Sequence, residues 1–202
     1  ESEVNKASRL ADQAKANREA ADRFAQLSDE FDAITLNLPW REWALDHQIV
    51  GAKKLAVAKR GILADKMGLG KTLTSLIYAD MLKARRILIL APNDVCTNFM
   101  KEIAHWAPHR TVVSLANNKP DERAFKFSIL KTYADNNGEF IVVVNYEAWR
   151  KDKSVLDSFV SLKFDTIIMD EAHTIKGKTT AAFKGILSAT MPLSLCRVLM
   201  AT

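Results

Sequence analysis

The stretch GILADKMGLGKT, residues 61–72, decides the fold of this chain. It begins with a short apolar run at 61–64, continues into a glycine-rich loop and ends on Lys71 and Thr72, where a helical pattern starts. This order is typical of a loop that binds phosphate, because glycines let the backbone curl and the helix N-terminus faces the anion. The strict motif has a glycine five positions before Gly70, where this chain has Asp65. An ordinary glycine turn followed by a chance Lys-Thr pair is the alternative.

The same alternation of apolar runs and helical patterns continues to the last residue. Continuous apolar runs predict strands that are buried on both faces. We expect strands at 61–64, 85–92, 111–116, 140–145, 164–170 and 197–202, and helices at 71–84, 94–107, 121–134, 154–162 and 179–187. Asp94 is the expected N-cap of the second of these helices. The pattern predicts an α/β fold with a parallel sheet and helices on both faces, and a chain that stops on a strand suggests part of a longer protein.

The first residues have a different character. Residues 3–30 contain no glycine or proline and carry alanines at helical spacing, so we expect an amphipathic helix with a weak apolar stripe. A linker at 31–38 should follow, and Pro39 suits the first turn of a helix that runs to about Lys59. We therefore divide the chain into a helical extension and linker at 1–34 and a main lobe at 35–202.

The amino-acid composition of the chain limits the classes of protein to which it can belong. The chain has 202 residues, 48% hydrophobic and 26% charged, which suits one globular domain with a sizeable core. No apolar run approaches the roughly 20 residues that a bilayer crossing needs, so we expect no membrane partner. Cys96 and Cys196 lack metal-ligand spacing and fit a reducing compartment, cytoplasmic in a bacterium or phage and nuclear in a eukaryote. The net charge of +5 permits a polyanionic partner without requiring one.

A pair of acids completes the candidate site. Asp170 and Glu171 end the apolar run at 164–170, and ligands in open parallel sheets bind beyond the carboxyl ends of the strands. Lys71 can reach the outer phosphates, and the Thr72 hydroxyl and the Asp170 carboxylate suit Mg²⁺. Glu171 can orient and deprotonate the attacking water, so we expect Lys71 and Glu171 to be catalytic. The acids alone also fit an ordinary helix cap; together with the loop they predict ATP and Mg²⁺ as cofactors.

At these residues a family resemblance appears. ADKMGLGKT (64–72), DEAH (170–173) and the segments between them resemble the Swi/Snf-type ATPases of helicase superfamily two. The resemblance covers residues 36–202 and follows the motif order of that family. It implies the first RecA-like lobe of a DNA-dependent ATPase that hydrolyses ATP and moves on double-stranded DNA. It also implies a second RecA-like lobe, which is absent from this chain.

The resemblance assigns roles to individual residues. In WALDHQIVGAKKL (43–55) it implies that Gln48 reads adenine. The implied ATP-binding set is Gln48, Asp65, Lys66, Met67, Gly68, Leu69, Gly70, Lys71 and Thr72. Coupling between the nucleotide and DNA sites is implied for His173, Ala201 and Thr202, and DNA contact for Asn98, Lys101 and Tyr146.

Several positions depart from the family pattern. Lys66 stands where glutamate is preferred, Phe99 where tryptophan is usual and Asn145 where serine or threonine is common. Thr174 and Gly177 replace the usual arginine and asparagine after the DEAH residues. These differences leave the subfamily and the natural DNA target open.

Two other functions remain as alternatives. A strand-separating helicase acting on RNA or DNA is the first, since DEAH also occurs in such enzymes, although MGLGKT argues against it. A nucleotide-binding scaffold without catalysis is the second, and the presence of both Asp170 and Glu171 counts against it.

Overall fold

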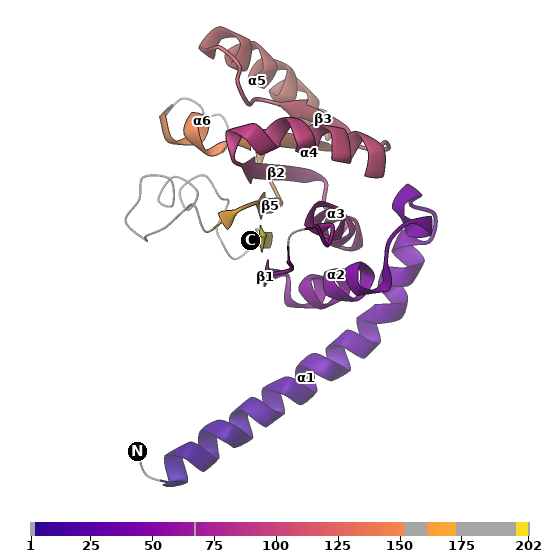
Figure 1. Cartoon of the computed structure of the whole chain (residues 1–202). Helices are drawn as coiled ribbons and strands as arrows, with labels where there is room; N and C mark the ends of the chain where they lie inside the picture. The colour runs from indigo at the N-terminus through magenta and orange to yellow at the C-terminus, as the bar shows by residue number, and fades with distance from the viewer. Residues whose placement is uncertain (1–2, 67, 152–160, 173–196, 202) are drawn as a thin grey trace.

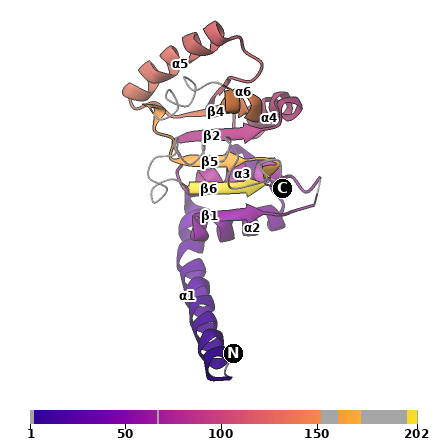
Figure 2. The same ribbon diagram turned by 90° about the vertical axis from the view of Figure 1, so that its left-hand side faces the viewer.

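The computed structural model describes residues 3–66, 68–151, 161–172 and 197–201. Within these ranges, six parallel strands form one sheet in the order β1-β6-β5-β2-β4-β3 (Figure 2). The strands are β1 (Arg60–Leu63), β2 (Arg86–Ala91), β3 (Thr111–Ser114), β4 (Phe140–Asn145), β5 (Thr166–Met169) and β6 (Arg197–Ala201). The predicted parallel α/β fold is confirmed, with each described strand at its expected place.

Helices cover both faces of this sheet (Figure 1). They are α1 (Glu3–Thr35), the 3₁₀ helix η1 (Pro39–Glu42), α2 (Asp46–Ala58), α3 (Lys71–Met81), α4 (Asn93–Trp106), α5 (Pro120–Asp135) and α6 (Tyr146–Lys151). The helix expected at 179–187 lies outside the described residues, and so does 154–160 of the helix expected at 154–162. In the part of the chain that the structure describes, every helix falls short of the length or apolar character that a bilayer crossing demands.

The central strands are apolar on both faces because each face supports a separate core. Successive side chains of a strand point to opposite faces of the sheet. In β2, Ile87 and Ile89 pack with α2, α3 and α4, whereas Leu88 and Leu90 pack with α5, α6 and the segment at 162–164. This division explains why the strand sequences contain uninterrupted apolar runs instead of alternating apolar and polar residues.

Helix α1 extends away from the sheet and is held at its C-terminal end (Figure 1). It runs on to Thr35, so the prediction of a linker at 31–38 is wrong for residues 31–35. The reason is burial: Phe31 is 5% exposed and Thr35 fully buried against the lobe, which keeps this segment helical. Asp32 adds ion pairs to Lys53 at 2.6 Å and to Arg41 at 3.0 Å.

The helix expected from Pro39 to Lys59 is broken in two. Pro39 opens η1 as predicted, but the backbone leaves helical geometry before α2 starts at Asp46. The break is stabilised on both sides, because the Trp40 indole donates to Asp80 at 2.8 Å and the Leu45 amide donates to Gln48 Oε1 at 3.0 Å. A second correction concerns α4, whose N-cap is Pro92, so that Asp94 lies in the first turn.

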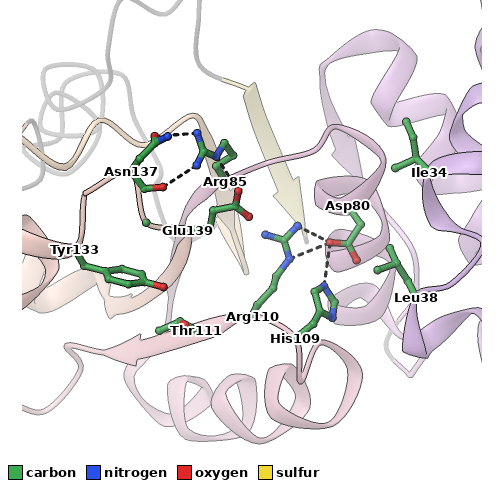
Figure 3. A pocket seen from close by; sticks show the side chains of 11 residues that line it. Ile34, Leu38, Asp80, Arg85, His109, Arg110, Thr111, Tyr133, Asn137 and Glu139 are labelled. Atoms are coloured by element: carbon green, nitrogen blue, oxygen red, sulfur yellow. Dashed lines mark hydrogen bonds and ion pairs between the residues drawn. The ribbon is translucent and has the colours of Figure 1, made fainter. Parts of the chain in front are cut away.

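The amino edge of the sheet contains a polar pocket of about 520 Å³ (Figure 3). One of its lining residues is Asp80, whose carboxylate is buried at the end of α3. Arg110 donates to this carboxylate from Nε at 2.9 Å and from Nη2, and His109 Nε2 lies 3.7 Å from the same oxygen. Burial alone would raise the pKa of Asp80, but these partners and Trp40 outweigh it and lower that pKa below its usual value. The network joins η1, α3 and the two residues that precede β3.

Candidate functional site

The loop after β1 has the conformation that its glycines predict. Gly68 has a φ of 86° and Gly70 a φ of 75°, in the left-handed region where a side chain is strained. A Cβ atom at Gly70 would also lie 2.2 Å from Gln48 Nε2, so two independent constraints favour glycine there. Asp65 keeps a negative φ, so the backbone does not require the glycine of the strict motif at that position.

Lys71 begins α3 and turns its ammonium group back over the loop. Its Nζ donates to the carbonyl oxygen of Asp65 at 3.1 Å. The next residue, Thr72, is half-buried in the first turn of the same helix. A cation and a hydroxyl therefore stand together at the helix N-terminus, where the partial positive charge of the backbone also attracts anions.

The acidic pair lies at the same edge of the sheet as the loop. Strand pairing sets Leu63 beside Ala201 and Met169 beside Met200, so β1, β6 and β5 end side by side. Asp170 follows β5 directly, and its backbone N–H donates to the Leu90 carbonyl at 2.8 Å. The expected meeting of loop and acids is thus a consequence of the strand order.

Asp170 is 8% exposed, and burial and neighbouring charges shift the pKa of its carboxyl group. Burial and the adjacent Glu171 carboxylate raise the pKa of the Asp170 carboxyl, while the charge of Lys71 lowers it. Asp170 and Thr72 offer oxygen ligands, which Mg²⁺ prefers, and one or two protein ligands are usual when phosphates and waters supply the rest. A bound Mg²⁺ would give this carboxylate the positive partner that favours its ionised form.

Gln48 supports the phosphate loop from α2. Its side chain is 5% exposed, and its Nε2 donates to the Leu69 carbonyl at 3.0 Å while its Oε1 accepts from the Leu45 amide. The resemblance implied that this glutamine reads adenine, but in this structure both polar atoms of its amide are engaged within the chain. The neighbouring His47 places Nε2 3.4 Å from the same Leu69 oxygen.

The expected DNA contacts divide into exposed and buried residues. Asn98 and Lys101 are exposed on α4, whereas Phe99 between them is buried in the core. Tyr146 is only 2% exposed, and its hydroxyl donates to the Asp170 carbonyl at 2.7 Å. The expectation that Tyr146 contacts DNA is therefore corrected: it links the end of β4 to the acidic pair. Burial and the charges of Asp170 and Glu171 raise the pKa of its phenol, which keeps the donor proton in place.

Of the remaining predicted site residues, the structure describes some and not others. Ala201 is the last residue of β6 and pairs with Leu63, immediately before the loop. Met67, His173 and Thr202 lie outside the described residues. Sequence reasoning missed the support that Gln48 gives the loop and the contact of Tyr146 with Asp170, because neither pair of residues has a local signature.

Known proteins resemble this chain in fold and in sequence. The fold is similar to that of the Sulfolobus solfataricus SWI2/SNF2 ATPase core in complex with dsDNA, with a TM-score of 0.60 and 21% identity over 77% of this chain and 31% of that one. A Drosophila melanogaster homologue of the SWI/SNF-related matrix-associated actin-dependent regulator of chromatin subfamily A containing DEAD/H box 1 is 28% identical over 71% of this chain and 18% of its own length. The chromatin-remodeling ATPase INO80 of Schizosaccharomyces pombe is 33% identical over 63% of this chain and 8% of its own length.

The chain spans less than a fifth of the length of both relatives. A family model described as the SNF2-related domain matches residues 25–196. The match begins within α1 and includes the phosphate loop, Asp170 and Glu171. Because it extends over most of the 202 residues, the chain belongs to the SNF2-related domain family.

Proposed function

We propose that this lobe binds ATP with Mg²⁺ and supports ATP hydrolysis within a motor that acts on double-stranded DNA. The observation that carries the proposal is the meeting of the glycine-rich loop and the acidic pair at the ends of β1 and β5. The charge of Lys71 lowers the pKa of Asp170, so the cation and the carboxylate act on the same region. Phosphoryl transfer needs this combination, because its catalysis consists largely of positioning and charge neutralisation.

Each residue has a proposed part in binding. Lys71 exchanges the Asp65 carbonyl for a phosphate oxygen, and the backbone N–H groups of the loop donate to the same phosphates. Thr72 and Asp170 hold Mg²⁺, which neutralises charge on the phosphates when bound. Gln48 holds the loop in its binding conformation through Leu69, and reading adenine requires its amide to leave that carbonyl.

We assign the hydrolysis step to Glu171, the residue that follows the proposed magnesium ligand Asp170. Glu171 has a φ of 49°, a strained backbone conformation for a residue with a side chain. Strain of this kind is often found at functional sites, and it sets the direction in which the carboxyl group leaves the strand end. We assign Glu171 the orientation and deprotonation of the attacking water.

We propose double-stranded DNA as the partner because polar side chains are exposed at the carboxyl edge of the sheet, where the ATP site also lies. Helix α4 follows β2 at the carboxyl edge and exposes Asn98 and Lys101, which suit contacts with a phosphate backbone. The structural relative bound to dsDNA supports this partner. A second lobe, supplied by a longer protein, would complete the ATP cleft. This function would place the protein in the nucleus of a eukaryote, or in the cytoplasm of a bacterium or phage.

The test compares ATP turnover by the 202-residue chain with turnover by a longer protein that includes a second lobe, each with and without duplex DNA. We expect the chain alone to bind ATP weakly and turn over little, because arginines from a partner element are worth roughly 10³–10⁵ in rate in related chemistry. DNA should stimulate the longer protein. Robust DNA-stimulated turnover by the lobe alone would contradict the two-lobe account, whereas ATP binding without turnover in the longer protein would favour a non-catalytic scaffold. Strand displacement by the longer protein would favour the helicase alternative.

A further inference from the structure

Three exposed lysines have a backbone conformation that is strained for a residue with a side chain. Lys59, Lys83 and Lys163 have φ angles of 61°, 50° and 52°, in the left-handed region that glycine adopts freely. The other non-glycine residues with a positive φ in the described part of the chain are two asparagines, which tolerate this region, and Glu171 of the candidate ATP site. Strain of this kind is frequent at functional sites, so the three lysines call for an explanation.

All three lysines lie at the amino edge of the sheet, where the parallel strands begin, opposite to the edge with the phosphate loop (Figure 2). Each follows the end of a helical segment, and Lys59 precedes β1, Lys83 precedes β2 and Lys163 precedes β5 by one to three residues. In the strand order, β5 is next to β2, and β1 is three positions from β2. At roughly 4.8 Å per strand, the three turns therefore extend over about 14 Å of this edge.

Hydrogen bonds hold these three turns in fixed positions. The carboxylate of Asp165 accepts from two backbone N–H groups, that of Arg85 at 2.9 Å and that of Arg86 at 3.2 Å, so the turn before β5 is joined to the turn before β2. The Tyr78 hydroxyl of α3 donates to the Lys59 carbonyl oxygen at 2.7 Å, which holds the turn before β1 to the helix that leads to β2. The backbones that carry the three lysines therefore form one connected surface.

The positive charge of the three lysines is not paired within the described residues. We call the segments that carry them the basic edge, which comprises residues 59–60, 83–86 and 163–165. Its charged side chains are Lys59, Arg60, Lys83, Arg85, Arg86 and Lys163 against the acidic Asp165. Arg85 is paired with Glu139 at 2.8 Å. In the part of the chain that the structure describes, none of the three lysine ammonium groups forms an ion pair, so their charge is available to a partner.

The attraction of a helix end for cations does not account for these positions. The partial negative charge at a helix C-terminus favours a lysine anywhere in the last turn, where φ is negative and no strain arises. Directly after a helix, glycine is the usual residue because it adopts a positive φ without strain. A lysine at each of the three positions keeps a positive charge in a conformation that glycine would adopt more easily, and this points to an anionic partner.

The surface of the basic edge suits phosphates better than an acidic protein. Stable protein interfaces have an apolar centre, and among the described residues none of the exposed large hydrophobic side chains belongs to the basic edge. Double-stranded DNA instead presents phosphates at a regular spacing of about 3.4 Å along each strand, so that about 14 Å corresponds to roughly four phosphates. Charges held at fixed positions along an edge match such a regular array.

We propose that the basic edge binds the phosphate backbone of a second segment of double-stranded DNA. The inference rests on the proposed function and extends it, because the DNA of the proposed function lies at the carboxyl edge. The six residues of β2 separate the two edges by about 20 Å at roughly 3.3 Å per residue. The two edges therefore offer separate surfaces, one for each segment of duplex.

The test measures whether the 202-residue chain brings two duplexes together. Donor-labelled and acceptor-labelled duplexes of roughly 20 base pairs, about two helical turns, are mixed with the chain, and energy transfer between them reports the bridged complex. Anisotropy with a single labelled duplex measures binding at one edge. Thermal unfolding followed by circular dichroism measures the stability of each variant.

The test variant combines Lys59→Gly, Lys83→Gly and Lys163→Gly, which removes the charges and relieves the strain. Arginine at the same three positions keeps the charge, and asparagine removes the charge but tolerates the positive φ. The charge-matched control removes three exposed basic side chains of α1, which extends away from the sheet (Figure 1): Lys15→Ala, Arg18→Ala and Arg23→Ala.

We expect the glycine variant to lower the affinity for the second duplex on the order of tenfold or more. The slope of log K against log salt for that duplex should fall by about three, because three phosphate contacts are lost. The unfolding temperature of the glycine variant should stay the same or rise, and single-duplex binding through Lys101 should remain. The arginine variant and the α1 control should bridge two duplexes as the unmodified chain does.

Bridging by the glycine variant that equals bridging by the unmodified chain would overturn the inference, and a lower unfolding temperature would then assign the lysines to the helix ends. An equal loss in the α1 control would also overturn it, because only net charge would matter. Polyglutamate that binds the unmodified chain more tightly than duplex DNA, and binds the glycine variant poorly, would make an acidic protein the partner. The asparagine variant decides each point if the glycine variant unfolds.

Failure of this inference and failure of the proposed function give different results. A chain that binds one duplex but never bridges two refutes the second segment and leaves the DNA partner at the carboxyl edge in place. Single-duplex binding that the glycine variant abolishes would support the basic edge but contradict the DNA contact proposed for α4. A chain that binds no duplex refutes both proposals.

Discussion

The side-chain amide of Gln48 lies 3.0 Å from the carbonyl oxygen of Leu69, in the space where a side chain at position 70 would begin. One hydrogen bond therefore joins α2 to the phosphate loop. Because Gln48 is buried and both of its polar atoms are used, the residue holds the loop in shape in this conformation. This relationship leads to the first prediction.

Gln48→Ala should weaken binding of ATP, GTP and inorganic triphosphate by similar factors, since all three need the loop. A lost hydrogen bond of about 0.5–1.5 kcal/mol corresponds to a change of a few-fold to about tenfold. Isothermal titration calorimetry with the three ligands provides the measurement. A loss restricted to ATP would show instead that Gln48 recognises adenine directly.

Lys71→Ala should abolish measurable ATP binding without unfolding the lobe. The triphosphate loses its main cationic partner, and charge-assisted hydrogen bonds are about twice as strong as neutral ones. The Lys71 ammonium group donates to the Asp65 carbonyl in the loop and lies outside the core, so its removal does not open the core. Titration with a fluorescent ATP analogue measures the loss, and Lys131→Ala serves as the charge-matched control. Unchanged affinity in Lys71→Ala would exclude this loop as the phosphate site.

Glu171→Gln should retain ATP binding and stop turnover in a longer, two-lobed protein. Glutamine preserves the shape of the side chain but cannot take a proton from water, and general base catalysis contributes roughly 10²–10⁴ in rate. Parallel measurements of nucleotide affinity and steady-state hydrolysis separate the two effects. Normal hydrolysis by this variant would assign the base to a different group.

Lys101→Ala should weaken binding to unrelated DNA duplexes equally. A lysine that contacts phosphate carries no sequence information, and its loss should reduce the slope of log K against log salt by about one. Anisotropy titrations over a range of salt concentrations, with two unrelated duplexes, test both statements. A loss that depends on sequence would mean that α4 reads bases.

Asp80 should make the folded lobe sensitive to acid. Its folded pKa lies below the unfolded value of about 3.9, so its contribution to stability is complete above that value and disappears as the pH falls through the folded pKa. Asp80→Asn leaves the largely buried side chain of Arg110 without its charge partner, and breaking a buried pair costs about 3–5 kcal/mol. Urea unfolding of both proteins between about pH 7 and about pH 3 should show this difference shrinking at the acid end. A difference that stays constant over that range would mean that the carboxylate does not titrate with folding.

The sequence predicted the parts of this lobe that have a local cause. Apolar runs identify β2 and β4 because both faces of these strands are buried, and parallel pairing then brings Lys71 and Asp170 to one edge. Contacts between distant segments leave no such pattern. Trp40 with Asp80 and Tyr146 with Asp170 are pairs whose members lie 40 and 24 residues apart, so their burial depends on the finished fold. The linker prediction failed for the same reason, because Phe31 is helical where it packs against the lobe.

The attachment of α1 has a mechanical consequence. Phe31 and the ion pairs of Asp32 fix the C-terminal end of the helix to α2 and η1, and the exposed remainder moves with the lobe as a lever. From Leu27 back to Glu3 the helix spans about 36 Å at 1.5 Å per residue. A rotation of the lobe by roughly a tenth of a radian therefore displaces the N-terminal end of the helix by about 4 Å. This displacement is larger than the length of a hydrogen bond, although the change of angle at the lobe is small.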